Sequence, residues 1–376
     1  MLAKATRQTG LIDFGDAAFR EPLEILLRSL REEARLNAQG VVMLERTVLR
    51  LLGNRLKAQR DWTTHPQIDC APIPRPLFIL GFPRTGTTLL HNLLACDPHA
   101  RFIHFWEGLY PSPPPEDFEN DPRIRAVEDW ARGFNRLAPR MSAVHHLDPR
   151  GPEECLWLLE HTFIDLIFEL RASVPTYSVW LAERENDADS YRYFKRLVQL
   201  LGYKRGGRHW VFKAPRHLFG LAGLLAVFPE ARIVQTHRDP LKVLPSLCSL
   251  CEVIRAAASD CVDKPAIGAH WQGRLKRVLA QSTQIRQTAS TAGQFLDIHY
   301  KDLVRDPLAT VARIYSHHGY EHTPEFERRM ETWLRDNRQH QRGRHDYTLA
   351  EYGLDATGVR ADFAGYCEQH GVAMED

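Results

Sequence analysis

The sequence predicts an α/β protein in three layers, with a central parallel sheet and an N-terminal helical segment. Short apolar runs typical of buried parallel strands occur at intervals from residue 77 onward. Stretches with helical spacing of apolar residues separate these runs, and helical crossovers are the usual connections of a parallel sheet. The expected strands cover residues 77–80, 210–212, 232–236 and 295–298.

Residues 17–60 are expected to be largely helical. Apolar residues recur there at helical spacing, namely Leu23, Leu26, Leu27, Leu30, Leu44, Val48, Leu51 and Leu52. We therefore expect a helical cap over residues 1–70, packed on a main domain over residues 71–376. A dimerisation arm, and with it a homodimer, is the alternative.

A second helical region is expected over residues 123–200, where apolar side chains again follow helical spacing. One helix face should carry Leu156, Leu159, Phe163 and Leu166.

Composition excludes several classes of protein. The 376 residues are 44% hydrophobic and 26% charged, which is ordinary for a globular protein whose core needs no disulfide or metal. A net charge of +2 does not favour a nucleic-acid partner. No apolar run approaches about 18 residues, so no membrane span is expected. The first residues lack the apolar core of a signal peptide, and a cytoplasmic location is expected.

The stretch LFILGFPRTGTTLLHNLL has the pattern of a phosphate-binding loop. A strand enters a glycine-containing loop that opens a helix, and the N–H groups of a helix N-terminus attract anions. Gly86 allows the backbone to approach a phosphate closely. Thr85, Thr87 and Thr88 offer hydroxyl donors, and Arg84 offers a positive charge.

The same loop departs from the pattern that binds ATP. That pattern is G-x-x-x-x-G-K-[ST], and this chain has Gly81 and Gly86 followed by threonine instead of lysine. An ATP site would lose its contact to the β- and γ-phosphates. A P-loop kinase or NTPase is therefore kept only as an alternative.

PRTGTT resembles the 5′-phosphosulfate loop of the sulfotransferase superfamily, usually written P-[KR]-[ST]-G-T-[TS]. The resemblance is best to the bacterial-type sulfotransferases and covers residues 70–360. It implies a P-loop-like fold and an enzyme that uses 3′-phosphoadenosine-5′-phosphosulfate (PAPS) and releases 3′,5′-adenosine bisphosphate. It implies no metal, because arginines supply the charge. A non-catalytic nucleotide-binding protein of the same fold is the second alternative.

The resemblance extends to a second set of nucleotide contacts. In the superfamily, an arginine after a strand and a serine eight residues later hold the 3′-phosphate, and Arg238 and Ser246 match this spacing. Arg342 and Gly343 resemble the basic, glycine-containing loop that closes over the same phosphate. Tyr300, in HYKDLVRDP, resembles a tyrosine that approaches the nucleotide.

The acceptor hydroxyl needs a base. The tyrosyl-protein branch uses a glutamate shortly after the first helix, and that place holds Glu107. The soluble hormone and phenol branch uses a histidine further along, for which His145 and His146 are candidates. We predict Glu107, because its Trp-Glu phrase lies where the first crossover returns to the edge of the sheet that carries the site.

Lys213 ends an apolar strand, where ligands gather in this fold class. It resembles a K-x-P lysine of the tyrosyl-protein branch that stabilises the transferring group, so we expect it to act with Arg84. His217 is expected near the acceptor, and Glu153 and Glu154 are weaker candidates for that contact.

The acceptor is expected to be a small molecule with a hydroxyl group. The aromatic and apolar character of residues 102–165 suits a lipid, a sterol or a phenol. A sugar and a peptide stay open.

Overall fold

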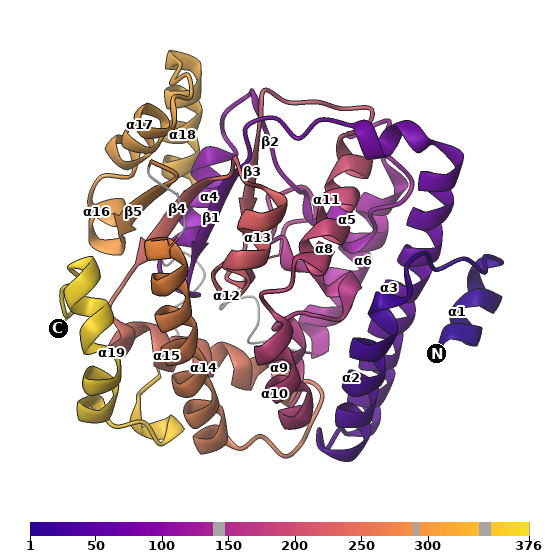
Figure 1. Ribbon diagram of the computed structural model, residues 1–376, viewed down its shortest axis with the longest axis horizontal. Helices are drawn as coiled ribbons and strands as arrows, with labels where there is room; N and C mark the ends of the chain where they lie inside the picture. Colours follow the sequence, from indigo (N-terminus) through magenta and orange to yellow (C-terminus); the bar gives the residue numbers. More distant parts are fainter. Residues whose placement is uncertain (138–146, 289–292, 338–346, 376) are drawn as a thin grey trace.

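A five-stranded parallel sheet forms the centre of the molecule (Figure 1). The computed structural model describes residues 1–137, 147–288, 293–337 and 347–375. The strand order is β2-β3-β1-β4-β5, and all neighbouring strands are parallel. The strands are β1 Leu77–Gly81, β2 Ala100–Arg101, β3 His209–Lys213, β4 Arg232–His237 and β5 Phe295–His299. The sheet confirms the predicted fold class and the four predicted strands, whereas the two-residue β2 was not predicted.

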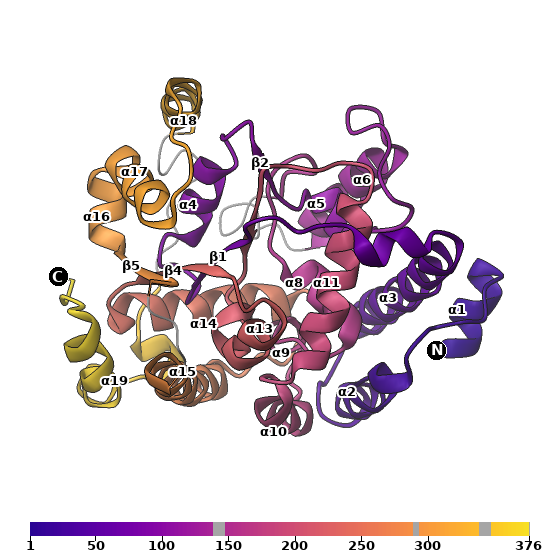
Figure 2. The same ribbon diagram turned by 45° about the horizontal axis from the view of Figure 1, so that its top comes forward.

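Helices cover both faces of the sheet, which gives the predicted three layers (Figure 2). Side chains alternate between the two faces of a strand. Leu77 and Ile79 of β1 therefore pack in one apolar cluster, and Phe78 and Leu80 pack in the other. The first cluster includes side chains of α4 Thr87–Leu94, α16 Tyr300–Arg305 and α17 Pro307–His318. The second includes side chains of α13 Leu221–Val227, α14 Pro240–Ala256 and α15 Lys264–Thr288.

The N-terminal segment is helical, but it is not one helix. It contains α1 Leu2–Thr9, the 3-10 turn η1 Ala17–Phe19, α2 Arg20–Glu32, α3 Ala38–Thr64 and the 3-10 turn η2 Pro66–Cys70. The helical conformation is interrupted between α2 and α3, where Arg35 has a left-handed φ of 49°. The Asn37 side chain then caps α3 by accepting a hydrogen bond from Gly40 N at 2.8 Å. Figure 1 shows α2 and α3 side by side at one end of the molecule. Their apolar residues share a core cluster with the sheet, and the division of the chain at residue 70 stays a prediction.

Several separate helices form the second helical region, and α5 precedes it. They are α5 Phe105–Leu109, α6 Pro122–Leu137, α8 Leu156–Leu159, the 3-10 turn η3 Glu160–Thr162, α9 Ile167–Arg171, α10 Pro175–Arg184 and α11 Ala188–Gly202. The predicted single face from Leu156 to Leu166 is wrong, because Phe163 adopts a left-handed φ of 59° and ends the helical turn. The short turns place several polar side chains of this region in the interior.

The remaining elements complete the two outer layers. They are α12 Arg216–Phe219, α18 Pro324–Asp336, the 3-10 turn η4 Ala350–Tyr352 and α19 Ala356–His370. Within the ranges given above, no helix combines the length and the apolar character that a membrane crossing requires.

Candidate active site

The predicted phosphate loop, residues 82–86, leaves the carboxyl end of β1 and enters α4. Arg84 and Gly86 both have left-handed backbones, with φ values of 72° and 88°. An arginine seldom adopts this conformation, so the surrounding contacts impose it. Thr85 is buried, and its hydroxyl lies 2.7 Å from the Phe82 carbonyl oxygen and 2.6 Å from Thr236 Oγ1. The bond to Thr236 fixes the loop to β4.

Helix α16 packs directly on this loop. A Cβ at Gly86 would lie 2.8 Å from Leu303 Cδ2 and 3.1 Å from Tyr300 Cδ2. Glycine is therefore required by close approach as well as by the left-handed backbone. The contact also brings Tyr300 to the phosphate loop, whose residues were predicted to bind the same nucleotide. Thr87 is buried in the first turn of α4, and Thr88 is exposed.

Arg238 follows β4 and connects three parts of the chain. Its Nη1 donates a hydrogen bond to the Arg84 carbonyl oxygen at 2.9 Å, and its guanidinium lies 3.9 Å from the centre of the Tyr300 ring. Its Nε and Nη2 each donate to the Glu375 carboxylate at 3.0 Å. Such a two-pronged contact with a carboxylate also suits a phosphate.

The other predicted nucleotide contacts differ in what the structure shows. Ser246 is buried in α14, the helix that follows Arg238. Arg342 and Gly343 lie outside the described residues.

Lys213 ends β3 beside β1, where it is paired in register with Ile79. Its side chain is buried, and its Nζ lies 2.5 Å from Glu154 Oε1. The backbone N–H of Cys155 donates to the Lys213 carbonyl oxygen at 2.9 Å, which holds the segment before α8 against the end of the strand. Lys213 and Glu154 therefore form an ion pair at the carboxyl edge of the sheet, where ligands bind in this fold class.

A cavity of about 880 Å³ adjoins this ion pair. Pro83 of the phosphate loop, Pro215 after β3, Glu153 and Glu154 contribute to its lining. Most of the remaining wall is aromatic or aliphatic, and includes Met43, Leu44, Trp130, Phe134, Trp157 and Leu166. Polar side chains also contribute to it, namely Gln39, Arg46, Thr47, Arg50, Asp129, Arg136 and Arg171. The cavity therefore joins the edge of the sheet to an apolar space between α3, α6 and α8.

Glu107 lies in different surroundings. It is fully buried in α5, where its Oε2 accepts hydrogen bonds from Arg101 Nη1 at 3.0 Å and from the His104 backbone N–H at 3.0 Å. Burial alone would raise the pKa of this carboxyl, but Arg101 and His104 outweigh it and lower the pKa to about 2. Glu107 is not among the described residues that line the cavity. Its role as the base stays a prediction, and the alternatives His145 and His146 lie outside the described residues.

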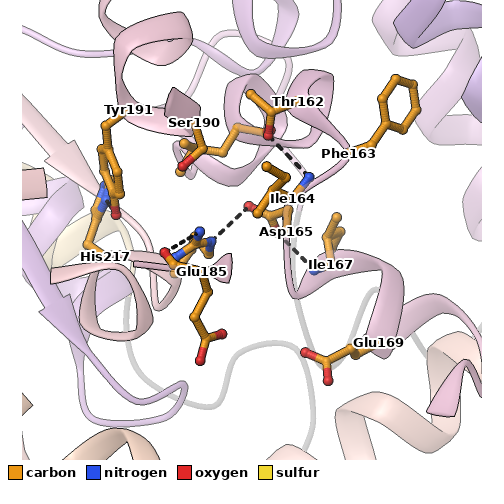
Figure 3. Close-up of polar contacts among 12 residues, drawn as sticks. Thr162, Phe163, Ile164, Asp165, Ile167, Glu169, Glu185, Ser190, Tyr191 and His217 are labelled. Carbon is orange, nitrogen blue, oxygen red and sulfur yellow. Dashed lines mark hydrogen bonds and ion pairs between the residues drawn. The ribbon is translucent and has the colours of Figure 1, made fainter. Parts of the chain in front are cut away.

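His217, on α12, belongs to a buried polar cluster that includes Tyr191 and Asp165 (Figure 3). Its Nδ1 lies 3.1 Å from the Tyr191 hydroxyl, and burial lowers its pKa to about 3. Next to it, Arg216 Nη2 donates to the Glu185 carbonyl oxygen at 2.7 Å, and its Nε lies 3.9 Å from Asp165 Oδ2. Burial raises the pKa of Asp165 to about 7. The only signal in the sequence for this cluster is a charged residue inside each of two apolar phrases, FIDL and APRHLF.

A second cluster was not anticipated from the sequence, because its members come from β4, β5 and α19. Side-chain atoms of His237, Asp297 and His370 that could bind a metal ion lie within 4.8 Å of one another. However, Asp297 already accepts hydrogen bonds from Arg286 at 2.8 Å and 2.9 Å, and His237 Nε2 lies 2.9 Å from it. The carboxylate charge is therefore compensated by protein groups.

Comparisons with known proteins agree with this geometry. A model of the Sulfotransferase family matches residues 76–325. The crystal structure of sulfotransferase STF1 from Mycobacterium tuberculosis H37Rv has a TM-score of 0.86 at 35% identity, over 97% of both chains. That of sulfotransferase STF9 from Mycobacterium avium has a TM-score of 0.91 at 28% identity, over 100% of this chain and 96% of that one.

A curated relative is similar over a shorter stretch. The omega-hydroxy-beta-dihydromenaquinone-9 sulfotransferase Stf3 of Mycobacterium bovis is 25% identical over 291 residues, which are 74% of this chain and 71% of the relative. The family model covers the phosphate loop, Lys213, Arg238 and Tyr300. Since it also covers most of the chain and the full-length structures agree with it, this protein belongs to the sulfotransferase family and is a sulfotransferase.

Proposed function

We propose that this enzyme transfers the sulfuryl group of PAPS to a hydroxyl group of an apolar small molecule and releases 3′,5′-adenosine bisphosphate. The observation that carries the proposal is the continuity between the phosphate loop and the apolar cavity, since Pro83 belongs to both. A donor held at the loop would present its transferring group to a molecule in the cavity. A cytoplasmic location is part of this proposal.

The donor half of the proposal assigns two anion contacts. The loop residues Arg84, Thr85, Gly86, Thr87 and Thr88 would hold the 5′-phosphosulfate at the N-terminus of α4. They are supported by the left-handed backbone at Arg84 and Gly86, since alternating backbone conformations of this kind form anion-binding concavities.

The 3′-phosphate would be held by Arg238 and Ser246, with Tyr300 beside them and Arg342 and Gly343 closing over it. Arg238 supports this assignment, because its guanidinium already holds an anion, the Glu375 carboxylate. The proposal includes no metal, because the arginines and Lys213 supply positive charge.

The acceptor half of the proposal rests on the chemistry of the cavity wall. Aromatic and aliphatic side chains make up most of this wall, so an apolar molecule gains more from burial against it than a sugar does. A lipid, a sterol or a phenol fits such a wall and would place one hydroxyl near Glu154. The name of the relative Stf3 specifies a hydroxylated menaquinone as its acceptor, which supports the same choice.

Two measurements test this proposal. Calorimetry should show binding of 3′,5′-adenosine bisphosphate without added magnesium, and much weaker binding of magnesium-ATP. Turnover of labelled PAPS should then be measured with 1-dodecanol, farnesol, cholesterol, 2-naphthol and glucose, and the apolar alcohols should exceed glucose. Tight binding of ATP with no binding of the bisphosphate would contradict the donor, and turnover of glucose alone would contradict the acceptor class.

A further inference from the structure

We propose that Glu154 is the base that takes the proton of the acceptor hydroxyl, and that Lys213 positions it and then stabilises the leaving group. This inference rests on the proposed function, since it places the hydroxyl in the cavity beside the phosphate loop. It assigns the proton transfer to a residue other than Glu107.

Access to the cavity distinguishes the two glutamates. The Glu154 side chain is 16% exposed and contributes to the cavity lining, whereas the Glu107 side chain is 0% exposed. A base must come within hydrogen-bond reach of the proton that it removes. Glu154 meets this requirement for a molecule in the cavity without movement of the main chain.

The main chain around Glu154 is held firmly. Glu153 N donates to the Ile103 carbonyl oxygen at 2.9 Å, and Cys155 N donates to the Lys213 carbonyl oxygen at 2.9 Å. The segment is thus fixed on one side to the chain after β2 and on the other to the end of β3. Catalytic groups on such a fixed segment keep the alignment that group transfer needs.

Glu153 is the neighbouring carboxylate, but its Oε1 accepts a hydrogen bond from Glu154 N at 2.8 Å. The Glu154 carboxylate is instead directed to Lys213, at the edge of the sheet. Of the two adjacent glutamates, we therefore assign the role of the base to Glu154.

The transfer step balances with these two residues. The acceptor oxygen forms a bond to sulfur, and its proton passes to a carboxylate oxygen of Glu154. The bond between sulfur and the bridging oxygen breaks, and its electron pair goes to the 5′-phosphate, which gains a negative charge.

Protonation of Glu154 removes the negative partner of buried Lys213 at the moment when this new charge appears. An unpaired buried charge is costly, so Lys213 is driven toward the leaving oxygen. Lys213 of this ion pair thus supplies the positive charge that the transition state needs.

Glu154→Gln tests the proposal, using PAPS and the alcohol of the above panel that the wild type converts fastest. kcat should fall by roughly 10²–10⁴, the usual value of a general base, while calorimetric affinity for 3′,5′-adenosine bisphosphate should not fall. The acidic limb of the kcat–pH profile should disappear in Glu154→Gln. Lys213→Met should lower kcat more than it raises the KM for PAPS, because Lys213 reaches the leaving oxygen only during the transfer.

Glu45→Gln is the matched control, because Glu45 pairs with Lys4 on the exterior of the N-terminal helices, and it should keep wild-type turnover. Wild-type kcat and pH profile in Glu154→Gln would overturn the inference. If this variant unfolds, Glu154→Asp replaces it, and an unshifted acidic limb there would assign the titration to another residue. A wild type that neither binds the bisphosphate nor converts PAPS would contradict the proposed function instead.

Discussion

Glu375 holds Arg238 by both of its carboxylate oxygens, with Nε–Oε1 and Nη2–Oε2 distances of 3.0 Å. The contact is secured on both sides, because Glu375 N donates to Asp239 Oδ2 at 2.7 Å and Lys301 Nζ donates to the Met374 carbonyl oxygen at 3.0 Å. If Arg238 binds the 3′-phosphate, this carboxylate and the nucleotide compete for one guanidinium. Binding of the nucleotide must then displace the Glu375 side chain.

Glu375→Gln should therefore bind 3′,5′-adenosine bisphosphate more tightly than the wild type. A partly exposed ion pair is worth about 1 kcal/mol, so the gain in affinity should be about 3- to 10-fold. Calorimetry measures it, with the exposed Glu368→Gln on α19 as the matched control. Adenosine 5′-phosphosulfate, which has no 3′-phosphate, should show no gain. An equal gain for both nucleotides would mean that Glu375 acts on something other than the 3′-phosphate contact.

Arg238→Ala should weaken binding of 3′,5′-adenosine bisphosphate by about 2–5 kcal/mol, because it leaves a phosphate charge without its partner in a partly dry site. The affinity for adenosine 5′-monophosphate should fall much less, and the difference between the two losses measures the contact between Arg238 and the 3′-phosphate. Equal losses would indicate that the variant acts through the Arg84 carbonyl oxygen and the shape of the loop.

Glu107→Gln should destabilise the fold, because it leaves buried Arg101 without its charge partner, at a cost of about 3–5 kcal/mol. The pKa of Glu107 is lowered from 4.5 to about 2, so this stabilisation is complete above pH 4.5 and is lost as the pH falls through 2. Denaturant unfolding at pH 7 and pH 3 should therefore show a smaller difference from the wild type at pH 3. A variant with wild-type stability whose turnover falls by roughly 10²–10⁴ would support Glu107 as the base instead of Glu154.

Asp165→Asn should change the pH dependence of stability in the opposite direction. The folded-state pKa of Asp165 is about 7, above its usual 3.8, so the folded protein binds a proton that the unfolded chain has released between these values. The wild type should therefore lose stability relative to the variant as the pH rises from 4 to 7, by about 2–4 kcal/mol. Parallel stability curves for the two proteins, measured by denaturant unfolding, would mean that Asp165 is ionised beside Arg216 throughout this range.

Local patterns in the sequence account for the parts of the site that were predicted. The phosphate loop is one continuous segment whose glycine, threonines and arginine are neighbours in the sequence, so the motif alone brings them together. The strands were predictable because parallel strands with two covered faces read as short apolar runs.

The contacts between distant segments could not be predicted in the same way. Lys213 and Glu154 are 59 residues apart, and Arg238 and Glu375 are 137 residues apart, so only packing brings them together. The partners of Glu107 are local, since Arg101 and His104 lie six and three residues before it, but its burial depends on the packing of α5 against α6 and α8. Sequence patterns thus identify which residues carry charge, and the fold decides which charges meet.

The wall that α3 contributes to the cavity has a consequence for acceptor preference. Val42, Met43 and Thr47 line the cavity, and all three precede residue 76, where the family match begins. If this cavity holds the acceptor, as proposed, the acceptor preference can change through substitutions in one N-terminal helix that leave the phosphate loop, Lys213 and Arg238 untouched. Grafting residues 38–64 from a relative should then shift turnover toward that relative's acceptor.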